Sequence, residues 1–151
     1  METFESAEAI LEFAIVREQE SYEFYTDLAG KVKNANAIAM FKIFAGEELG
    51  HKRKLIKAKE QKQLTAVSST VTDLKIGDYL VDIEPSPGMG YQEALILAMK
   101  KEKAAFKLYT DLSEKAGDES LRSFFLALAQ EEAKHKLSFE LEYDDYVLTE
   151  N

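Results

Sequence analysis

The residue types best suited to chemistry in this chain are two histidines and the glutamates near them. The chain contains only two histidines, His51 and His135, and each follows a glutamate by three residues, Glu48 and Glu132. Residues three apart on an α-helix lie on the same face, so each Glu and His can bind one ion together. The two Glu-x-x-His motifs therefore indicate metal coordination on helices.

An internal repeat relates the two motifs to each other. Shifting the sequence by 84 residues pairs residues 11–52 with residues 95–136 without a gap, and fourteen of the forty-two pairs are identical. Unrelated segments would match at roughly two or three positions. The two motifs coincide under this shift, and Glu18 coincides with Glu102. A duplicated helical hairpin predicts internal two-fold pseudo-symmetry, with shared residues meeting near the axis.

Glu18 and Glu102 interrupt faces that are otherwise typical of a core. At steps of three and four residues, the inward faces of the first and third helices are Leu11, Ala14, Glu18, Tyr22, Tyr25 and Leu28, and Leu95, Ala98, Glu102, Phe106, Tyr109 and Leu112. With the two Glu-x-x-His pairs, four carboxylates and two imidazoles point at one core. The expected metal ligands are Glu18, Glu48, His51, Glu102, Glu132 and His135.

Six ionisable groups in an apolar interior need partners of opposite charge, because burying an unpaired charge costs on the order of several kcal/mol. Two divalent cations would balance four carboxylates, with both histidines neutral. The alternative is a duplicated bundle that has lost its metal, in which lysines pair with these carboxylates.

Neighbouring residues are ranked with the help of the repeat. Glu20 corresponds to Ala104, so Glu18 is preferred as a ligand. Glu47 and Glu131 are repeated and lie four residues before a histidine, and they rank behind the six ligands as residues around the site or on the surface.

Two repeated tyrosines follow the lone glutamates. Tyr25 and Tyr109 stand seven residues after Glu18 and Glu102, on the same helix faces and about 10 Å along each axis. They are candidates to support the ligands, with ordinary core aromatics as an equal alternative.

The elements that must position these residues are four helices in two hairpins. Helical periodicity covers residues 6–62 and 90–147, with polar breaks at residues 30–36 and 116–118, and Asp118 is a candidate N-cap. Residues 63–89 hold both prolines and predict a long crossover, within which residues 73–81 are a candidate short helix. An all-α four-helix bundle with one long crossover between the second and third helices follows.

Bulk composition sets limits on the whole chain. Its 151 residues fit one domain, residues 1–151, and the absence of cysteine excludes thiolate metal sites within the chain. The net charge of −9 argues against nucleic acid, and neither a secretory signal nor a membrane span is visible. We expect a cytoplasmic protein without membrane or nucleic-acid partners.

At the six candidate ligands and the two repeated tyrosines, the chain resembles the rubrerythrin-like members of the ferritin-like di-iron superfamily. The motifs that carry the resemblance are Glu18-x6-Tyr25, Glu48-x-x-His51, Glu102-x6-Tyr109 and Glu132-x-x-His135. The resemblance covers nearly the whole chain except the crossover. It implies a ferritin-like fold in which the six ligands bind two irons between the four helices.

The chain departs from that family in two ways. It has no cysteine-containing rubredoxin domain, so the resemblance implies a separate electron donor such as a rubredoxin-like protein. Rubrerythrins usually carry a further ligand Glu where this chain has Ala105, and that Glu takes part in the iron movement associated with peroxide reduction. The ligand set is therefore closer to the symmetric four-Glu, two-His site of bacterioferritin.

The leading hypothesis is a non-haem di-iron oxidoreductase that reduces peroxide or dioxygen. The alternatives are ferritin-like iron oxidation and storage or sequestration, and a metal-binding module without turnover. A carboxylate-rich set suits iron or manganese better than structural zinc, and the resemblance favours two iron ions, with manganese or zinc as alternatives. A homodimer is expected, as is common for ferritin-like bundles.

Overall fold

Four long helices make up the computed structural model, which describes residues 6–61, 74–81 and 88–150. They are α1 (Ala7–Lys31), α2 (Ala35–Glu60), α3 (Tyr91–Lys115) and α4 (Glu119–Glu150). The described residues contain no β-strand. The expected all-α four-helix bundle is confirmed.

Three of the four helices, α1, α2 and α4, begin at a residue whose side chain caps the N-terminus. The Ser6 side chain accepts a hydrogen bond from the backbone N–H of Ala9, and Asn34 accepts from Asn36 and Ala37. Asp118 Oδ1 lies 2.7 Å from the backbone nitrogen of Leu121. Small polar side chains at these positions satisfy N–H groups that have no partner within the helix. The breaks between helices therefore lie where the sequence predicted them.

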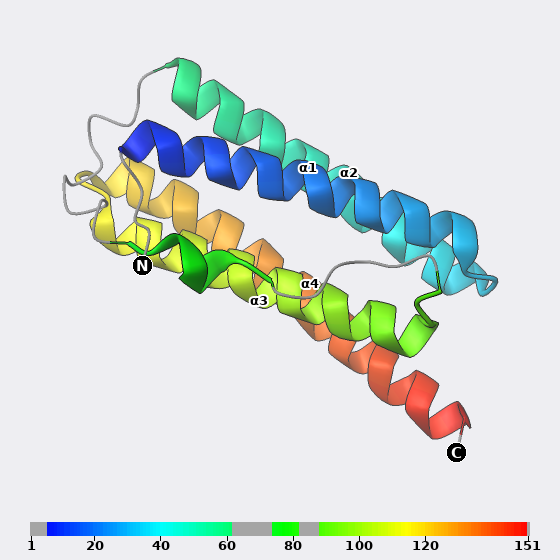
Figure 1. Cartoon of the computed structure of the whole chain (residues 1–151). Helices are drawn as coiled ribbons and strands as arrows, with labels where there is room; N and C mark the ends of the chain where they lie inside the picture. The colour runs from blue at the N-terminus through cyan, green and yellow to red at the C-terminus, as the bar shows by residue number, and fades with distance from the viewer. Residues whose placement is uncertain (1–5, 62–73, 82–87, 151) are drawn as a thin grey trace.

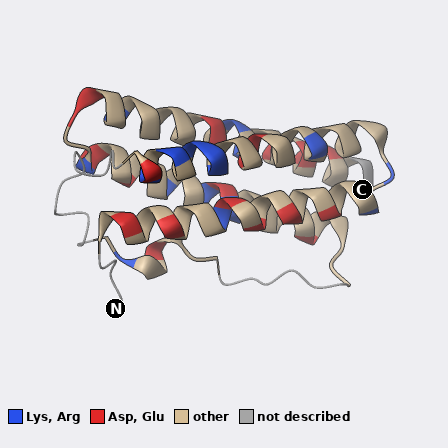
Figure 2. Cartoon of the chain, turned by 90° about the horizontal axis from the view of Figure 1, so that it is seen from above, with Lys and Arg blue, Asp and Glu red and all other residues tan. Residues whose placement is uncertain are grey.

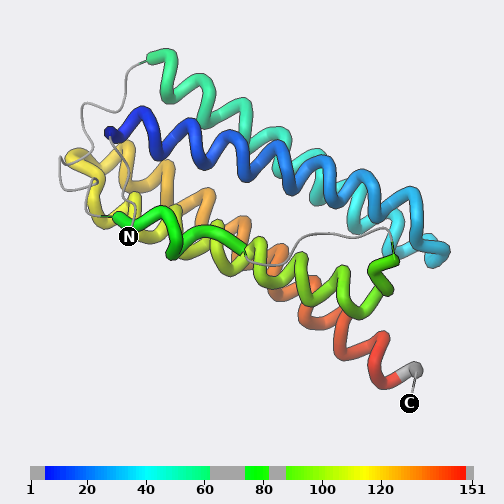
Figure 3. The backbone as a smooth tube through the Cα atoms, in the orientation of Figure 1, coloured from blue at the N-terminus to red at the C-terminus, as the bar shows by residue number. Residues whose placement is uncertain are grey.

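The chain forms two antiparallel hairpins, α1 with α2 and α3 with α4, which lie one above the other (Figure 1). The tube view shows α2 ending at one end of the bundle and α3 beginning at the other (Figure 3). Residues 63–89 must therefore carry the chain back along the bundle, as the long-crossover prediction requires.

The described part of the crossover lies against α3. It contains the 3₁₀-helix η3 (Ile76–Tyr79), which is shorter than the candidate helix over residues 73–81. Residue 73, both prolines and the segment 65–72 lie outside the described residues. The buried Tyr79 donates a hydrogen bond to Asp111 Oδ2 of α3 at 2.7 Å, which ties η3 to the hairpin.

The interior contains two apolar clusters, one toward each end of the bundle. The first includes Leu11, Leu55, Leu112, Phe125 and Leu128, together with Tyr109. The second includes Tyr25, Phe41, Leu95, Ala98 and Phe139. Both draw on all four helices. A layer of charged residues separates them.

Basic and acidic residues alternate along the lengths of the helices (Figure 2). Within the described residues, no helix combines the length and the apolarity that crossing a membrane requires.

One expected core position is wrong. Phe106 is 40% exposed, although it was assigned to the inward face of α3. Successive residues are about 100° apart around a helix. The face that buries Ala94, Ala98, Tyr109 and Leu112 is therefore centred near residue 105, and Phe106 lies at its margin. Ala105 takes the more central position and packs against the first cluster. Tyr22, the counterpart of Phe106 in α1, is only partly buried.

Candidate metal centre

All six residues expected as ligands lie in the charged layer between the apolar clusters. Glu18 comes from α1, Glu48 and His51 from α2, Glu102 from α3, and Glu132 and His135 from α4. None is more than 2% exposed. Glu20, which the repeat had ranked below Glu18, is exposed and forms an ion pair with Arg17 at 2.7 Å.

The six residues form two overlapping groups of potential ligands. One consists of Glu18, Glu48, His51 and Glu132, and the other of Glu48, Glu102, Glu132 and His135. Within each group the ligand atoms lie within 4.8 Å of one another. Glu48 and Glu132 belong to both groups, so they have the positions of bridging carboxylates. Glu18 and Glu102 each belong to one group.

Both imidazole rings present Nδ1 to this cluster. His51 Nδ1 lies 2.8 Å from Glu132 Oε1 and 3.4 Å from Glu48 Oε1. His135 Nδ1 lies 3.2 Å from Glu48 Oε1 and 3.5 Å from Glu102 Oε1. The rings are stacked, with centroids 6.4 Å apart. Nδ1 is therefore the nitrogen that each histidine can offer to a metal.

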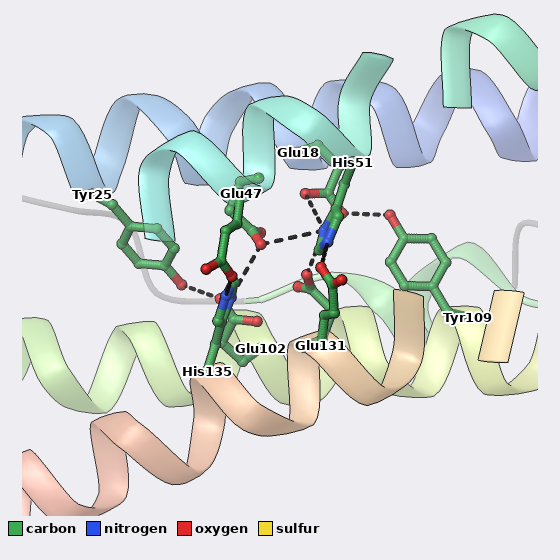
Figure 4. Close-up of polar contacts among 10 residues, drawn as sticks. Glu18, Tyr25, Glu47, His51, Glu102, Tyr109, Glu131 and His135 are labelled. Atoms are coloured by element: carbon green, nitrogen blue, oxygen red, sulfur yellow. Dashed lines mark hydrogen bonds and ion pairs between the residues drawn. The ribbon is translucent and has the colours of Figure 1, made fainter. Parts of the chain in front are cut away.

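The other nitrogen of each ring is held by a glutamate from the opposite half of the repeat. His51 Nε2 contacts Glu131 Oε2, and His135 Nε2 lies 2.6 Å from Glu47 Oε2 (Figure 4). A proton on Nε2, donated to the carboxylate, leaves the Nδ1 lone pair free for a metal. Glu47 and Glu131 thus orient the histidines, a role that sequence reasoning had not assigned to them. The sequence signal for this role was that Glu47 and Glu131 occupy equivalent positions in the two halves of the repeat.

The two tyrosines form hydrogen bonds with Glu18 and Glu102, the two candidate ligands outside the Glu-x-x-His motifs. Each of these hydrogen bonds again joins one half of the repeat to the other. Tyr25 donates a hydrogen bond to Glu102 Oε1, and Tyr109 donates to Glu18 Oε1, each at 2.5 Å (Figure 4). Both tyrosines are fully or almost fully buried. Burial, followed by the charge of the nearby glutamates, raises the pKa of each phenol well above 10, so both remain donors.

The pKa values of the cluster show that, without cations, the charges of its buried glutamates are poorly balanced. Burial raises the pKa values of Glu48 and Glu132 well above normal, and the charge of Glu102 adds to this. Burial opposes charging of the histidines, but neighbouring glutamates outweigh it and raise the pKa of His51 to about 9 and that of His135 to about 11. Protons therefore take the place that cations would fill.

The hydrogen bonds of the cluster lead to the same conclusion. One atom in each of the six residues is buried without a hydrogen-bond partner: Glu18 Oε2, Glu48 Oε1, His51 Nδ1, Glu102 Oε2, Glu132 Oε1 and His135 Nδ1. Unsatisfied buried polar atoms are rare in folded proteins. Carboxylate oxygens and neutral imidazole nitrogen are a donor set that suits iron or manganese. Among the described residues, the ion pairs of this cluster involve only histidines and glutamates, so the lysine-paired alternative is not realised there.

A cavity of about 520 Å³ opens on one side of the cluster. It lies between α1 and α3 and reaches Glu18, Glu48 and Tyr109. On the other side, Glu47 and Glu131 cover the histidines from α2 and α4, and Phe44 stacks on His135 with ring centroids 4.1 Å apart. A reactant can therefore reach the cluster from the α1–α3 side.

Comparison with curated proteins gave no match, and comparison with solved structures gave none either. The family model for rubrerythrin, in contrast, matches residues 9–143. This range contains α2, α3, all but the first two residues of α1, all but the last turns of α4, and every residue of the cluster. With its four-helix bundle and its buried cluster of carboxylates and histidines, the chain belongs to the rubrerythrin family.

Proposed function

We propose that the protein is a non-haem di-iron oxidoreductase that reduces peroxide or dioxygen. The observation that carries this proposal is the set of six buried atoms, one from each expected ligand, that lack hydrogen-bond partners and face a common centre. Four carboxylates and two neutral histidines would be balanced by two divalent cations. The family to which the chain belongs favours iron.

Each residue of the cluster has a distinct role in this proposal. Glu48 and Glu132, which belong to both groups of potential ligands, would contribute to holding both ions, and Glu18 and Glu102 would each contribute to holding one. Tyr25 and Tyr109 hold one oxygen of Glu102 and Glu18, and the other oxygen of each glutamate faces the centre unpaired. Glu131 and Glu47 fix the orientation of His51 and His135. Bound ferrous ions would supply two electrons to the oxidant.

These 151 residues contain no cysteine for a rubredoxin-type site that could return electrons to the centre. We propose a separate rubredoxin-like protein as the donor and a homodimer as the assembly.

Anaerobic titration with Fe(II), followed by absorbance, tests the proposal. We expect two ions per chain and rapid oxidation when peroxide is added, with slower oxidation in air. Binding of fewer than two ions, or no reaction with either oxidant, would contradict a di-iron oxidoreductase.

A pair of double variants tests the ligands. Glu18→Ala with Glu102→Ala should reduce loading to one ion or none, with helix content unchanged by circular dichroism. Glu20→Ala with Glu114→Ala removes two exposed carboxylates from the same helices and should still bind two ions. Full loading of the first variant would refute the assignment.

Iron oxidation and storage is the second candidate, and Ala105 is the observation that favours it. The side chain at this position borders the cavity beside Glu18, where the resemblance predicts a further Glu in peroxide-reducing relatives. Accumulation of iron well above two ions per chain in air, within a large assembly, would favour storage over peroxide reduction.

A further inference from the structure

The cavity between α1 and α3 is much larger than hydrogen peroxide requires. Its volume is about 520 Å³, whereas a water molecule occupies about 30 Å³ of the liquid, and hydrogen peroxide has only one more oxygen atom. Pockets that bind small organic molecules measure roughly 300–1,000 Å³. The cavity therefore has the size of an organic ligand site.

Much of the cavity wall is apolar. It is formed in part by Phe24, Leu80, Val81, Ala104, Ala105 and Leu108. Leu80 and Val81 follow η3, which the hydrogen bond from Tyr79 to Asp111 fixes on α3. Ala104 and Ala105 keep the α3 side of the cavity open because their side chains are small. The wall thus suits an apolar group of several carbon atoms.

The charges around the cavity do not favour an anion. Apart from the glutamates of the cluster, the lining contains the carboxylates of Glu20, Glu23 and Asp27 and the cations of Arg17 and Lys101. Arg17 is already paired with Glu20 at 2.7 Å, and the side chain of Lys101 lies over the Phe24 ring. With three carboxylates and two cations in the lining, a neutral molecule fits the cavity better than an anion does.

The end of the cavity that borders the metal cluster is polar. Glu18 and Glu48 border it, and each has a buried oxygen without a hydrogen-bond partner. A ligand whose apolar part lies against Leu80, Val81 and Leu108 would present its polar end to this region.

We propose that the cavity binds neutral organic hydroperoxides, with the alkyl or aryl group against its apolar wall and the hydroperoxy group toward Glu18 and Glu48. This inference rests on the proposed function for its chemistry. The O–O bond of ROOH breaks and, with two electrons from the two ferrous ions and two protons from solvent, gives ROH and H₂O.

Steric filling of the cavity tests the inference through catalysis. In the iron-loaded protein, Ala105→Leu should lower kcat/KM for cumene hydroperoxide at least tenfold and change that for hydrogen peroxide less than twofold. Ala127→Leu, the same substitution at an exposed position of α4, should leave both values unchanged. Equal loss for both peroxides, or reduction of hydrogen peroxide alone by the unmodified protein, would overturn the inference.

Binding of a redox-inert product provides a readout that needs no turnover. In the zinc-loaded protein, 2-phenyl-2-propanol should shift the amide resonances of Leu80, Val81, Ala104 and Ala105, and Ala105→Leu should weaken its binding at least fivefold. Its para-carboxylate derivative should also bind at least fivefold more weakly. Absence of binding would overturn the inference, whereas binding without peroxide reduction would support the organic site and contradict the proposed function.

Discussion

At the scale of single residues, each half of the repeat supports the candidate metal ligands of the other half. Tyr25 and His51 belong to the first hairpin, but their partners Glu102 and Glu131 belong to the second. Tyr109 and His135 make the matching contacts with Glu18 and Glu47. Ligand positions therefore depend on the packing of the two hairpins against each other.

Removing one tyrosine hydroxyl should weaken metal binding on one side of the centre. In Tyr25→Phe, Glu102 loses the donor that fixes one of its oxygens, and loss of such a supporting contact costs about 10- to 100-fold in affinity. We expect at least tenfold weaker binding of one Co(II) ion, measured by anaerobic absorbance titration. Tyr22→Phe removes the hydroxyl of a partly buried tyrosine that packs against the second apolar cluster, and this variant should bind Co(II) as the unmodified protein does. A change below twofold in Tyr25→Phe would contradict the role of this hydrogen bond.

The glutamates behind the histidines should matter through their position more than through their charge. Burial opposes ionisation of Glu131, but the contact with His51 outweighs it and keeps the pKa of Glu131 low. Glu131→Ala frees the His51 ring and should weaken Co(II) binding about tenfold. Glu131→Gln keeps an acceptor oxygen and should lose less. If Gln and Ala weaken binding equally, the carboxylate charge is what matters.

Sequence reasoning located the six candidate ligands because charged residues interrupt apolar faces that recur in both halves. It did not identify Glu47 and Glu131 as the partners of the histidines, because each contact joins residues at least 80 positions apart on helices whose relative rotation no periodicity specifies. Phe106 was placed inside for a related reason: hydrophobicity alone does not show where a buried face ends.

At the scale of elements, the helices depend on short polar caps between long amphipathic segments. The break before α4 places Asp118 where its side chain binds the N–H of Leu121. Such breaks could be predicted from the sequence because capping is local. The contact of η3 with α3 could not, since the hydrogen bond from Tyr79 to Asp111 joins segments with no shared pattern.

Loss of the α4 cap should destabilise the protein measurably. Asp118→Ala removes the acceptor for the Leu121 N–H and the favourable negative charge at the helix start, a loss of about 1 kcal/mol. For a chain of this length that corresponds to a decrease in Tm of about 2–4 °C, to be measured by circular dichroism. Asp118→Asn, which keeps the oxygen, should lose less than half as much. An unchanged Tm in Asp118→Ala would show that the cap contributes nothing to stability.

At the scale of the whole molecule, the charged layer between two apolar clusters makes the stability of the metal-free protein depend on pH. The pKa values of His51 and His135 are raised in the fold to about 9 and about 11. A raised pKa in the fold stabilises the protein fully below the unfolded value, about 6.5 for histidine, and this contribution is lost as pH rises through the folded value. The raised pKa values of Glu48 and Glu132 act in the same direction.

We therefore expect the Tm of the chelator-treated protein to fall by about 5 °C or more between pH 6.5 and 9. The metal-loaded protein should show a much smaller decrease, since its histidines are already neutral. Thermal scans of both forms across this range measure the difference. A Tm of the metal-free form that is constant or rises with pH would contradict the proton-bearing state of the cluster.

The crossed contacts between the halves also bear on how the protein matures. While a ribosome is still producing the second hairpin, the first hairpin offers Glu18, Glu48 and His51 without Tyr109 or Glu131 to hold them. Stable capture of two ions, as proposed, would therefore wait until His135 has been synthesised and the hairpins have docked. In the proposed di-iron protein, docking of the two hairpins is therefore the step that completes the site.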